Sequence, residues 1–364
     1  MRIGAIGAGP VGIALVAALK RVGKAELIWY VRNDPLRERL SQEGVGVSFQ
    51  ELAGVGAARY APDDPERMLP DELSAAPSAV DMLREVAERE PAVWISLAPE
   101  ELVSTPEALV EAQPDITLAC VKAQAVLPLR ARLAAHLRGL HFFVVNGFWL
   151  HAGIDLGVMY GGGYSAGNRA FLIPRGRLAL GRTKSPHADF VVAVRAEGSP
   201  GTLVYRHEDL ELLESLAGFF DPAVLRVESC PDIYPLMLRK AALNSLVNPL
   251  ASLAGQPNGV LLMREARPIA AVMAQEIVRV LAAASMMPPG NRGFGAEELL
   301  QEFDRVCTDT AGNLCSQLVD RALGRPDELR YLNRLLLSVA QRYGIPMPLN
   351  AAICGLLQLP PLCP

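Results

Sequence analysis

The sequence predicts an α/β protein in which a domain with a mostly parallel β-sheet, residues 1–230, precedes an all-helical domain, residues 231–364. Two observations lead to this fold class. The chain opens with an apolar strand, a glycine-rich turn, a helix and a second strand, which is the order of a βαβ unit. From residue 232 onward strand signals disappear and helical periodicity dominates, so we expect the domain boundary near residue 230.

The opening βαβ unit is delimited by its turn residues. Pro10 suits the first turn of a helix, where its missing N–H would be unpaired in any case. Gly23 suits the left-handed conformation that ends many helices. We therefore expect an amphipathic helix from residue 10 to Val22, between two parallel strands.

The rest of the first domain continues this pattern with one interruption. Residues 60–113 are rich in proline and acidic residues, and we interpret them as an insertion that serves as a lid or a contact surface. Between Gly157 and Tyr205, apolar and turn residues alternate, which predicts antiparallel strands at the sheet edge. The other expected elements are strands in 115–122 and 140–147, a helix in 125–139, a helix in 207–220 and a short strand in 224–228.

Composition favours a globular protein that acts on small molecules. The chain has 364 residues, of which 51% are hydrophobic and 20% charged, and its formal charge is −4. This charge provides no basic field for nucleic-acid binding. The six cysteines show no CxxC pair, which argues against a zinc site or a disulfide framework. No apolar run reaches the ~18 residues of a membrane span and no signal peptide is apparent, so we expect a cytoplasmic location.

Residues 7–12 form a GxGxxG motif between the first predicted strand and helix. Glycine clusters also arise by chance, but this placement is the one that dinucleotide binding requires. Gly7 permits the tight turn, Gly9 lets the backbone approach a pyrophosphate, and Gly12 allows close packing of helix and strand. The expected cofactor-binding loop of a Rossmann-type domain thus comprises Gly7, Ala8, Gly9, Pro10, Val11 and Gly12.

The second predicted strand ends in WYVRND and indicates which dinucleotide is bound. NAD-binding proteins usually place an acidic residue here, ~20 residues past the glycines, on the ribose 2′-hydroxyl. This chain has Arg32, whose guanidinium can bind a 2′-phosphate through bidentate, charge-assisted hydrogen bonds. NADP(H) is therefore favoured over NAD(H), with Arg37 as a weaker helper; the alternative is a solvated loop arginine.

Residues 238–255 form an apolar run in which three polar residues recur. Lys240, Asn244 and Asn248 are spaced by four residues, which in a helix puts them on nearly one face, drifting by ~40° per step. Either this face is a polar stripe turned to solvent or it lines a binding site.

Five further polar residues are candidates whose position alone does not decide their role. Lys122 and Asn146 follow two predicted parallel strands, at the edge where open α/β sheets bind ligands. A charge emerging into water is the competing explanation for Lys122. Asn313 and Ser316 taken alone are helix-surface residues, and Glu328 is a first-turn carboxylate.

Together these segments resemble the ketopantoate reductase (2-dehydropantoate 2-reductase) family over nearly the whole chain apart from residues 60–113. The shared blocks occur in the same order: GxGxxG, an arginine closing the second strand, VK, NG, RKxxxNxxxNPL and NxxSxxxDxxxGRxxE. The lysine–asparagine helix followed by the Asn–Ser–Glu segment is the specific part. In that family a Rossmann domain precedes an all-helical domain, and the active site lies in the cleft.

The resemblance implies an activity and a role for each matching residue. Lys240 would be the general acid to the ketone oxygen, and Glu328 the family's active-site glutamate. The implied activity is NADPH-dependent reduction of a 2-oxo acid, most simply 2-dehydropantoate to (R)-pantoate in pantothenate biosynthesis, by a monomer or homodimer. The implied substrate-binding residues are Asn244, Asn248, Asn313 and Ser316, and the implied cleft residues are Lys122 and Asn146.

Several departures from the family pattern leave the substrate open. Cys315 and Gln317 stand where the family often has serine and methionine, Phe148 follows NG, and Ala125 replaces a common glutamine or aspartate. One alternative is a reductase or opine-type dehydrogenase of the same superfamily that acts on a bulkier 2-oxo acid. A second alternative is a non-catalytic NADP-binding regulatory protein, against which the retained Lys240 argues.

Overall fold

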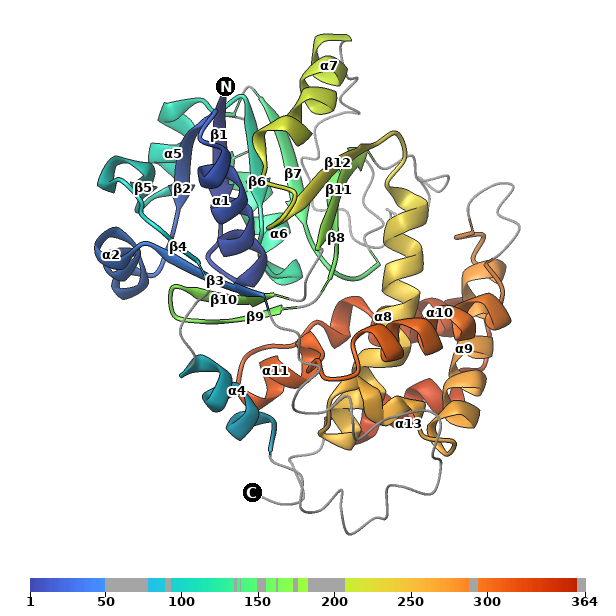
Figure 1. Ribbon diagram of the computed structural model, residues 1–364. Helices are drawn as coiled ribbons and strands as arrows, with labels where there is room; N and C mark the ends of the chain where they lie inside the picture. Colours follow the sequence, from blue (N-terminus) through green and yellow to red (C-terminus); the bar gives the residue numbers. More distant parts are fainter. Residues whose placement is uncertain are drawn as a thin grey trace. The chain divides into compact units, whose positions relative to one another are not determined.

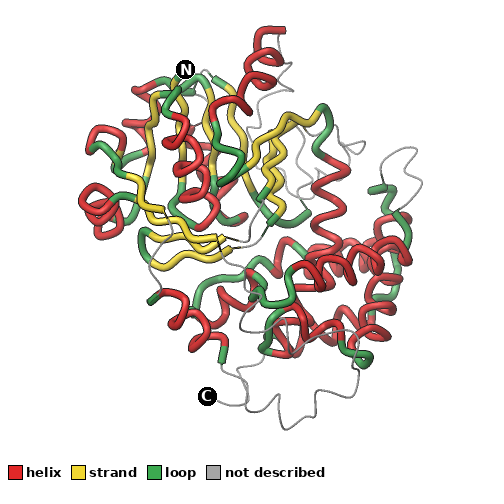
Figure 2. The backbone as a smooth tube through the Cα atoms, viewed as in Figure 1, coloured by secondary structure: helices red, strands yellow, loops and turns green. Residues whose placement is uncertain are grey.

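The computed structural model contains two compact units, one mixed α/β and one helical (Figures 1 and 2). It describes residues 1–49, 78–88, 93–133, 136–137, 139–148, 155–161, 163–172, 176–182, 207–287 and 294–358. The first unit comprises Met1–Gln50, Arg89–Asn146 and Leu150–Tyr234, and the second comprises Glu51–Glu88, Gly147–Trp149 and Pro235–Pro364. The division at residue 230 that the sequence suggests stays a prediction about functional domains.

The α/β unit is built on an eight-stranded sheet. Six strands are parallel in the order β5-β2-β1-β6-β7-β8, which is the order of a doubly wound dinucleotide-binding sheet. β11 pairs antiparallel with β8, and β12 pairs parallel with β11 at the edge. The strands are β1 (Arg2–Ile6), β2 (Glu26–Tyr30), β5 (Leu102–Val103), β6 (Ile116–Ala119), β7 (Leu140–Val144), β8 (Asp155–Tyr160), β11 (Arg177–Arg182) and β12 (Arg226–Cys230). The predicted Rossmann-type fold is confirmed.

Of the helices of this unit, α1 (Pro10–Val22) matches the sequence prediction at both ends. It has Pro10 in its first turn and ends at Gly23, whose φ of 68° is left-handed. The sequence prediction of both caps is therefore confirmed. The remaining helical elements are α2 (Asp34–Glu43), η3 (Pro99–Glu101), α5 (Pro106–Ala112), α6 (Ala123–Leu133), α7 (His207–Ser215) and η5 (Leu216–Phe219).

A second, four-stranded sheet is the main feature that the sequence analysis missed. It has the order β4-β3-β10-β9, from the strands β3 (Val45–Phe49), β4 (Val93–Ile95), β9 (Gly163–Ala166) and β10 (Arg169–Leu172). The expectation that all strands between 157 and 205 extend the edge of one sheet is therefore wrong for β9 and β10, which belong to this second sheet. Any strand expected between residues 183 and 205 lies outside the described residues.

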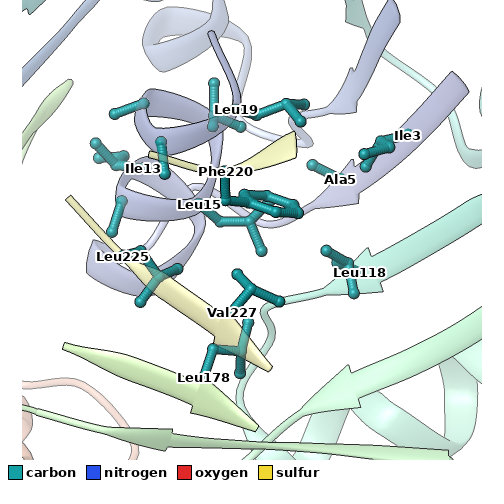
Figure 3. Packing of buried hydrophobic residues seen from close by; sticks show 14 of the residues in the cluster. Ile3, Ala5, Ile13, Leu15, Leu19, Leu118, Leu178, Phe220, Leu225 and Val227 are labelled. Atoms are coloured by element: carbon teal, nitrogen blue, oxygen red, sulfur yellow. The ribbon is translucent and has the colours of Figure 1, made fainter. Parts of the chain in front are cut away.

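The second sheet also changes the environment of α1. The helix packs against β1 and β2 of the large sheet and against β3, β9 and β10 of the small one. Every residue from Gly12 to Leu19 is consequently buried, whereas the sequence predicted an amphipathic helix with one exposed face. In Figure 3, Ile13, Leu15 and Leu19 of α1 lie among side chains from β1, β6, β11 and β12 and that of Phe220, which follows η5.

Part of the segment expected to be an insertion, residues 60–113, belongs to the two sheets. β4 pairs with β3 and β5 pairs with β2, so both strands are integral to the α/β unit. α4 (Ala79–Ala87) instead belongs to the helical unit, where it packs against α11 (Ser316–Ala322). The residues between 60 and 77 lie outside the described ranges, and a role as a lid stays a prediction.

The helical unit contains no strand in its described part, as the sequence predicted. Its elements after residue 234 are α8 (Tyr234–Ala254), η6 (Asn258–Leu262), α9 (Ala266–Ala283), α10 (Ala296–Asp309), α11, η7 (Leu329–Tyr331), α12 (Asn333–Arg342) and α13 (Pro348–Leu356). None of the helices in the described ranges is long and apolar enough to cross a membrane.

Two residues from the middle of the chain complete this unit. The main-chain N–H of Phe148 donates to the Tyr331 carbonyl oxygen at 2.9 Å, and the Phe148 side chain is 1% exposed. Gly147 has a φ of +104°, and a Cβ there would lie 2.7 Å from the same carbonyl oxygen. Phe148, flagged in the sequence as a departure from the family, is thus a packing residue of the helical unit.

Candidate active site

The glycine loop joins β1 to α1 in a tightly packed turn. Gly7 has a φ of +94°, and a Cβ there would lie 2.3 Å from the Cys120 carbonyl oxygen. A Cβ on Gly12 would lie 2.1 Å from the Gly7 carbonyl oxygen. A Cβ on Gly9, in contrast, meets no atom of the described ranges within 4 Å. Packing therefore requires glycine at the first and third positions, and the backbone at Gly9 faces open space that a ligand can approach.

Trp29 of β2 holds this loop in place, and the sequence analysis missed it. Its indole Nε1–H donates to the Gly7 carbonyl oxygen at 3.0 Å, and the Trp29 side chain is fully buried. The Gly7 N–H in turn donates to the Tyr30 carbonyl oxygen at 3.2 Å. A buried tryptophan needs an acceptor for its N–H, so a tryptophan inside a predicted core strand is the signal that could have indicated this contact.

The N-terminus of α1 has the properties of an anion-binding site. Its capping residue, Gly9, has an extended backbone and no side chain that could accept from the first N–H groups. Pro10 occupies the next position, and Ala8 and Val11 are partly exposed. The positive end of the helix dipole and its uncapped N–H groups can therefore bind a pyrophosphate.

Arg32 and Arg37, which follow β2, differ in availability. Arg37 is engaged, because its guanidinium donates to the Val31 carbonyl oxygen at 3.3 Å and to Asp34 at 2.6 Å. Arg32 is exposed, and in the described part of the chain its side chain has no hydrogen bond or ion pair. Arg32 is thus free to bind an anion such as a 2′-phosphate.

Lys122 and Asn146 lie at the same edge of the large sheet as the glycine loop. Lys122 is exposed and follows β6, and Asn146 is half-buried and follows β7. β1, β6 and β7 are adjacent and parallel, so their carboxyl ends meet at one edge. These residues and the loop at residues 7–12 are therefore brought together within the α/β unit.

The helical unit carries Lys240, Asn244 and Asn248 on α8, the yellow helix of Figure 1. Lys240 and Asn244 are half-buried and Asn248 is buried. Burial lowers the pKa of Lys240 from 10.5 to about 8, while the negative charge of Glu328 acts in the opposite direction. Glu328 is itself buried, where its carboxylate stabilises the protonated amine.

Cys315, which lies between Asn313 and Ser316 in the sequence, contacts α8. Cys315 caps α11, and its thiol accepts from the Leu318 N–H at 3.4 Å. The same thiol donates to the Asn248 carbonyl oxygen at 3.6 Å. Burial raises the pKa of Cys315, so the thiol stays neutral and able to donate. The thiol therefore fastens the start of α11 to the turn of α8 that carries Asn248.

Three buried amides in this region have unused hydrogen-bonding capacity. Asn258 donates its main-chain N–H to the Asn313 carbonyl oxygen and its side-chain N–H to Thr310, both at 2.9 Å. Among the residues that the structure describes, the side-chain oxygens of Asn258 and Asn313 have no partner, and neither amide atom of Gln317 has one. All three side chains are more than nine-tenths buried. A polar ligand could satisfy these groups, which makes Asn258 and Gln317 candidate binding residues.

The sequence analysis did not include Asn258 or Gln317 among the candidate site residues. Asn258 lies in a Pro–Asn–Gly run that reads as an ordinary turn, and only its contact with Asn313 connects it to the site. Gln317 was noted only as a departure from the family. Its significance depends on burial, which the sequence does not reveal.

The two units therefore carry complementary chemistry. The α/β unit offers an uncapped helix start and the unpaired Arg32 for a dinucleotide. The helical unit offers Lys240, which can hold and release a proton near neutral pH, and a set of amides for a polar ligand. Among the described residues, no group of three or more histidine, cysteine, aspartate or glutamate side chains could hold a metal ion.

Comparisons with known proteins agree with these features. Residues 232–360 match the family model "Ketopantoate reductase PanE/ApbA C terminal". A curated relative, 2-dehydropantoate 2-reductase from Pyrobaculum aerophilum, is 32% identical over 149 residues, which cover 41% of this chain and 48% of the relative. The chain thus spans about half the length of the curated relatives it matches.

Solved structures resemble the chain in fold. The 2-dehydropantoate 2-reductase from Geobacter metallireducens superposes with a TM-score of 0.66 at 19% identity, covering 98% of this chain and 99% of its own. A ternary structure of D-mandelate dehydrogenase with NADH and anilino(oxo)acetate gives a TM-score of 0.68 at 16% identity, covering 98% and 97%. The likeness to the ketopantoate reductase family that the motifs indicate is thus confirmed, in sequence for residues 232–360 and in fold for 98% of the chain.

Proposed function

We propose that the protein is an NADPH-dependent reductase of a 2-oxo acid, most simply 2-dehydropantoate reduced to (R)-pantoate in pantothenate biosynthesis. The observation that carries this proposal is Lys240, whose pKa is lowered to about 8 by burial and which faces the charge of Glu328. Curated relatives named 2-dehydropantoate 2-reductase support the substrate.

Reduction of a ketone requires a hydride and a proton. Bound NADPH would supply the hydride to the carbonyl carbon. Negative charge then develops on the carbonyl oxygen, and Lys240 donates the proton from its Nζ to that oxygen, giving the hydroxy acid. Glu328 keeps the amine protonated before the reaction and favours its reprotonation from solvent afterwards.

The cofactor-binding residues in this proposal are those of the α/β unit. The loop of Gly7, Ala8, Gly9, Pro10, Val11 and Gly12 binds the pyrophosphate, Arg32 binds the 2′-phosphate, and Lys122 and Asn146 line the cofactor site. The open space at Gly9, the uncapped α1 and the unpaired Arg32 fit a dinucleotide phosphate. Arg32→Ala is expected to raise the KM for NADPH about 10- to 100-fold, as for a lost charged hydrogen bond of ~1.5–3 kcal/mol. An unchanged KM for NADPH, or a preference for NADH in the unmodified protein, would exclude this role.

The substrate-binding residues in this proposal are Asn244, Asn248, Asn313 and Ser316, which provide amides and a hydroxyl for the polar groups of the acid. Two observations favour a bulkier 2-oxo acid as a second candidate. Gln317 brings an unpaired buried amide next to Ser316. The D-mandelate dehydrogenase that shares the fold is solved with anilino(oxo)acetate, which carries an aromatic ring.

The decisive experiment follows oxidation of NADPH with 2-dehydropantoate and with a panel of 2-oxo acids that includes phenylglyoxylate. Lys240→Ala is the test variant, and Lys24→Ala, at an exposed lysine of the α/β unit, is its matched control. Turnover of 2-dehydropantoate that is lost in the first variant and kept in the second supports the proposal. Turnover of other acids alone supports the second candidate.

A third outcome distinguishes an enzyme from a sensor. Tight NADPH binding without turnover of any acid would contradict the proposal and leave a non-catalytic NADP-binding regulatory protein. Residual activity of Lys240→Ala close to that of the unmodified protein would remove Lys240 from the mechanism.

The proposal extends to the roles of the two domains, the location of the protein and its oligomeric state. Residues 1–230 would bind the cofactor and residues 231–364 the acid. A small-molecule reductase with a formal charge of −4 needs neither nucleic acid nor a membrane, and we infer a cytoplasmic monomer or homodimer. Light scattering of the purified protein determines the oligomeric state.

A further inference from the structure

α8 contains a proline in its interior, at position 249. Proline has no N–H, so the carbonyl oxygen of Ser245, four residues earlier, loses the donor it would have in a regular helix. This turn is buried: Pro249 is buried and Ser245 is fully so. A buried carbonyl group without a partner destabilises a fold by ~1–3 kcal/mol.

Asn333, at the start of α12, supplies the missing donor. Its side-chain Nδ2 donates to the Ser245 carbonyl oxygen at 2.8 Å and to Asn350 Oδ1 at 2.9 Å. Asn350, on α13, donates from its own Nδ2 to Glu276 Oε2 at 2.7 Å. These three side chains are at most 1% exposed. A continuous buried chain of hydrogen bonds therefore runs from the Glu276 carboxylate to the break in α8.

The direction of this chain is fixed by its charged end. The Glu276 carboxylate accepts from the main-chain N–H groups of Leu349 and Asn350, both at 3.0 Å. A carboxylate is only an acceptor, so Asn350 turns its Nδ2 towards Glu276 and its Oδ1 towards Asn333. Asn333 must then present its Nδ2 to both Asn350 and Ser245. The network thus requires a donor, and not an acceptor, at the Ser245 carbonyl oxygen.

The break lies between the residues that the proposed function assigns to substrate binding. Lys240 and Asn244 precede Ser245, whereas Asn248 adjoins Pro249. The relative direction of the two asparagines therefore depends on the one turn of α8 that lacks its regular hydrogen bond.

We propose that Asn333 is a positioning residue: its amide replaces the helical donor that Pro249 removes, and thereby sets how Asn244 and Asn248 are presented to the substrate. Only the effect on Asn244 and Asn248 as substrate-binding residues rests on the proposed function. The hydrogen-bond replacement itself is independent of what the protein catalyses.

A double-mutant cycle tests the replacement. Asn333→Leu removes the donor at similar volume, and Pro249→Ala restores a main-chain N–H that can donate to Ser245. We expect Asn333→Leu to raise the unfolding equilibrium constant at least tenfold more in the native background than in the Pro249→Ala background. The loss of the contact to Asn350 is common to both backgrounds and cancels.

Two results of the cycle would refute the inference that the Asn333 amide replaces the helical N–H. Additive effects of the two substitutions would show that Asn333 does not substitute for the helical N–H. If Asn333→Leu does not fold by itself, the double variant is expected to fold, and its failure to do so would likewise refute the inference.

Steady-state kinetics test the positioning. Asn333→Leu is expected to raise the KM for the 2-oxo acid about tenfold, to leave the Kd for NADPH unchanged and to be restored by Pro249→Ala. A merely structural role would lower the active fraction without moving KM, and an unchanged KM overturns the positioning. An inactive unmodified protein with a non-additive cycle indicates failure of the proposed function, whereas an active one with an additive cycle indicates failure of this inference.

Discussion

Burial of Lys240 makes a prediction about stability as well as activity. The substitution is Lys240→Met, which keeps an unbranched side chain one atom shorter than that of lysine and removes its charge. Because the folded state disfavours the charged amine, as the fall in its pKa to about 8 indicates, the variant is expected to be more stable than the unmodified protein at neutral pH. Turnover is expected to be lost, since the proposed function makes Lys240 the proton donor.

The magnitude follows from the pKa. A change from 10.5 to about 8, at ~1.4 kcal/mol for each tenfold change in the proton equilibrium, corresponds to roughly 3 kcal/mol against the folded state at neutral pH. Between these two values the unfolded chain binds more protons than the folded one, so stability rises with pH through this window. Above the unfolded value the amine is neutral in both states, and this contribution vanishes.

Glu328 reduces the gain in unfolding free energy that Lys240→Met is expected to show by itself. Without the amine, its buried carboxylate has lost the cation that Lys240 provides. The double variant Lys240→Met with Glu328→Gln is therefore expected to approach the full stabilisation of roughly 3 kcal/mol.

The assay is urea unfolding of each variant at pH 7 and at intervals up to pH 10. Lys24→Met, at an exposed lysine, is the control and is expected to differ from the unmodified protein by a constant amount. The reasoning is refuted if the double variant is not more stable than the unmodified protein at pH 7. It is equally refuted if the advantage does not shrink as the pH rises above 8.

Three other experiments, the first of which compares two glycine substitutions, test single contacts. Gly12→Ala places a Cβ 2.1 Å from the Gly7 carbonyl oxygen, so it is expected to lower the melting temperature and abolish NADPH binding. Gly9→Ala places a Cβ that meets no described atom within 4 Å, so it is expected to keep the melting temperature. Equal melting temperatures of the two variants would contradict the packing argument. Trp29→Phe removes the donor to Gly7 and is expected to raise the Kd for NADPH about tenfold in calorimetric titration, as for a loss of ~1–3 kcal/mol; an unchanged Kd would show that the loop does not need the indole. Gln317→Met replaces an unpaired buried amide and is expected to stabilise the ligand-free protein by ~1–3 kcal/mol in urea unfolding, so a loss of stability would mean that the amide is already satisfied.

Local features of the fold could be predicted and pairings over long distances could not. Pro10 and Gly23 mark the ends of α1 because each acts through its own backbone conformation. The pairing of β3 with β10 joins residues more than a hundred positions apart and has no local signature. Since that pairing creates the sheet that covers the outer face of α1, the sequence also misjudged the exposure of the helix.

The same distinction holds for the candidate site. A spacing of four residues is enough to place Lys240, Asn244 and Asn248 on one helix face. The value of the Lys240 pKa depends instead on burial and on Glu328, which is distant in sequence. The thiol of Cys315 reaches the Asn248 carbonyl oxygen only in the folded unit, so its capping role could not be inferred from the motif.

The packing of Phe148 in the helical unit limits where the chain can be cut to give a fragment that folds by itself. A fragment that begins at residue 235 lacks this side chain, which is 1% exposed in the intact unit. Removing a buried phenylalanine side chain destabilises a protein by ~3–5 kcal/mol, a large part of the ~5–15 kcal/mol that holds a typical domain together. Residues 235–364 are therefore not expected to fold fully when they are fused to another protein without Phe148. During synthesis the helical unit can complete its packing only with Gly147 and Phe148, which are made nearly ninety residues before residue 235.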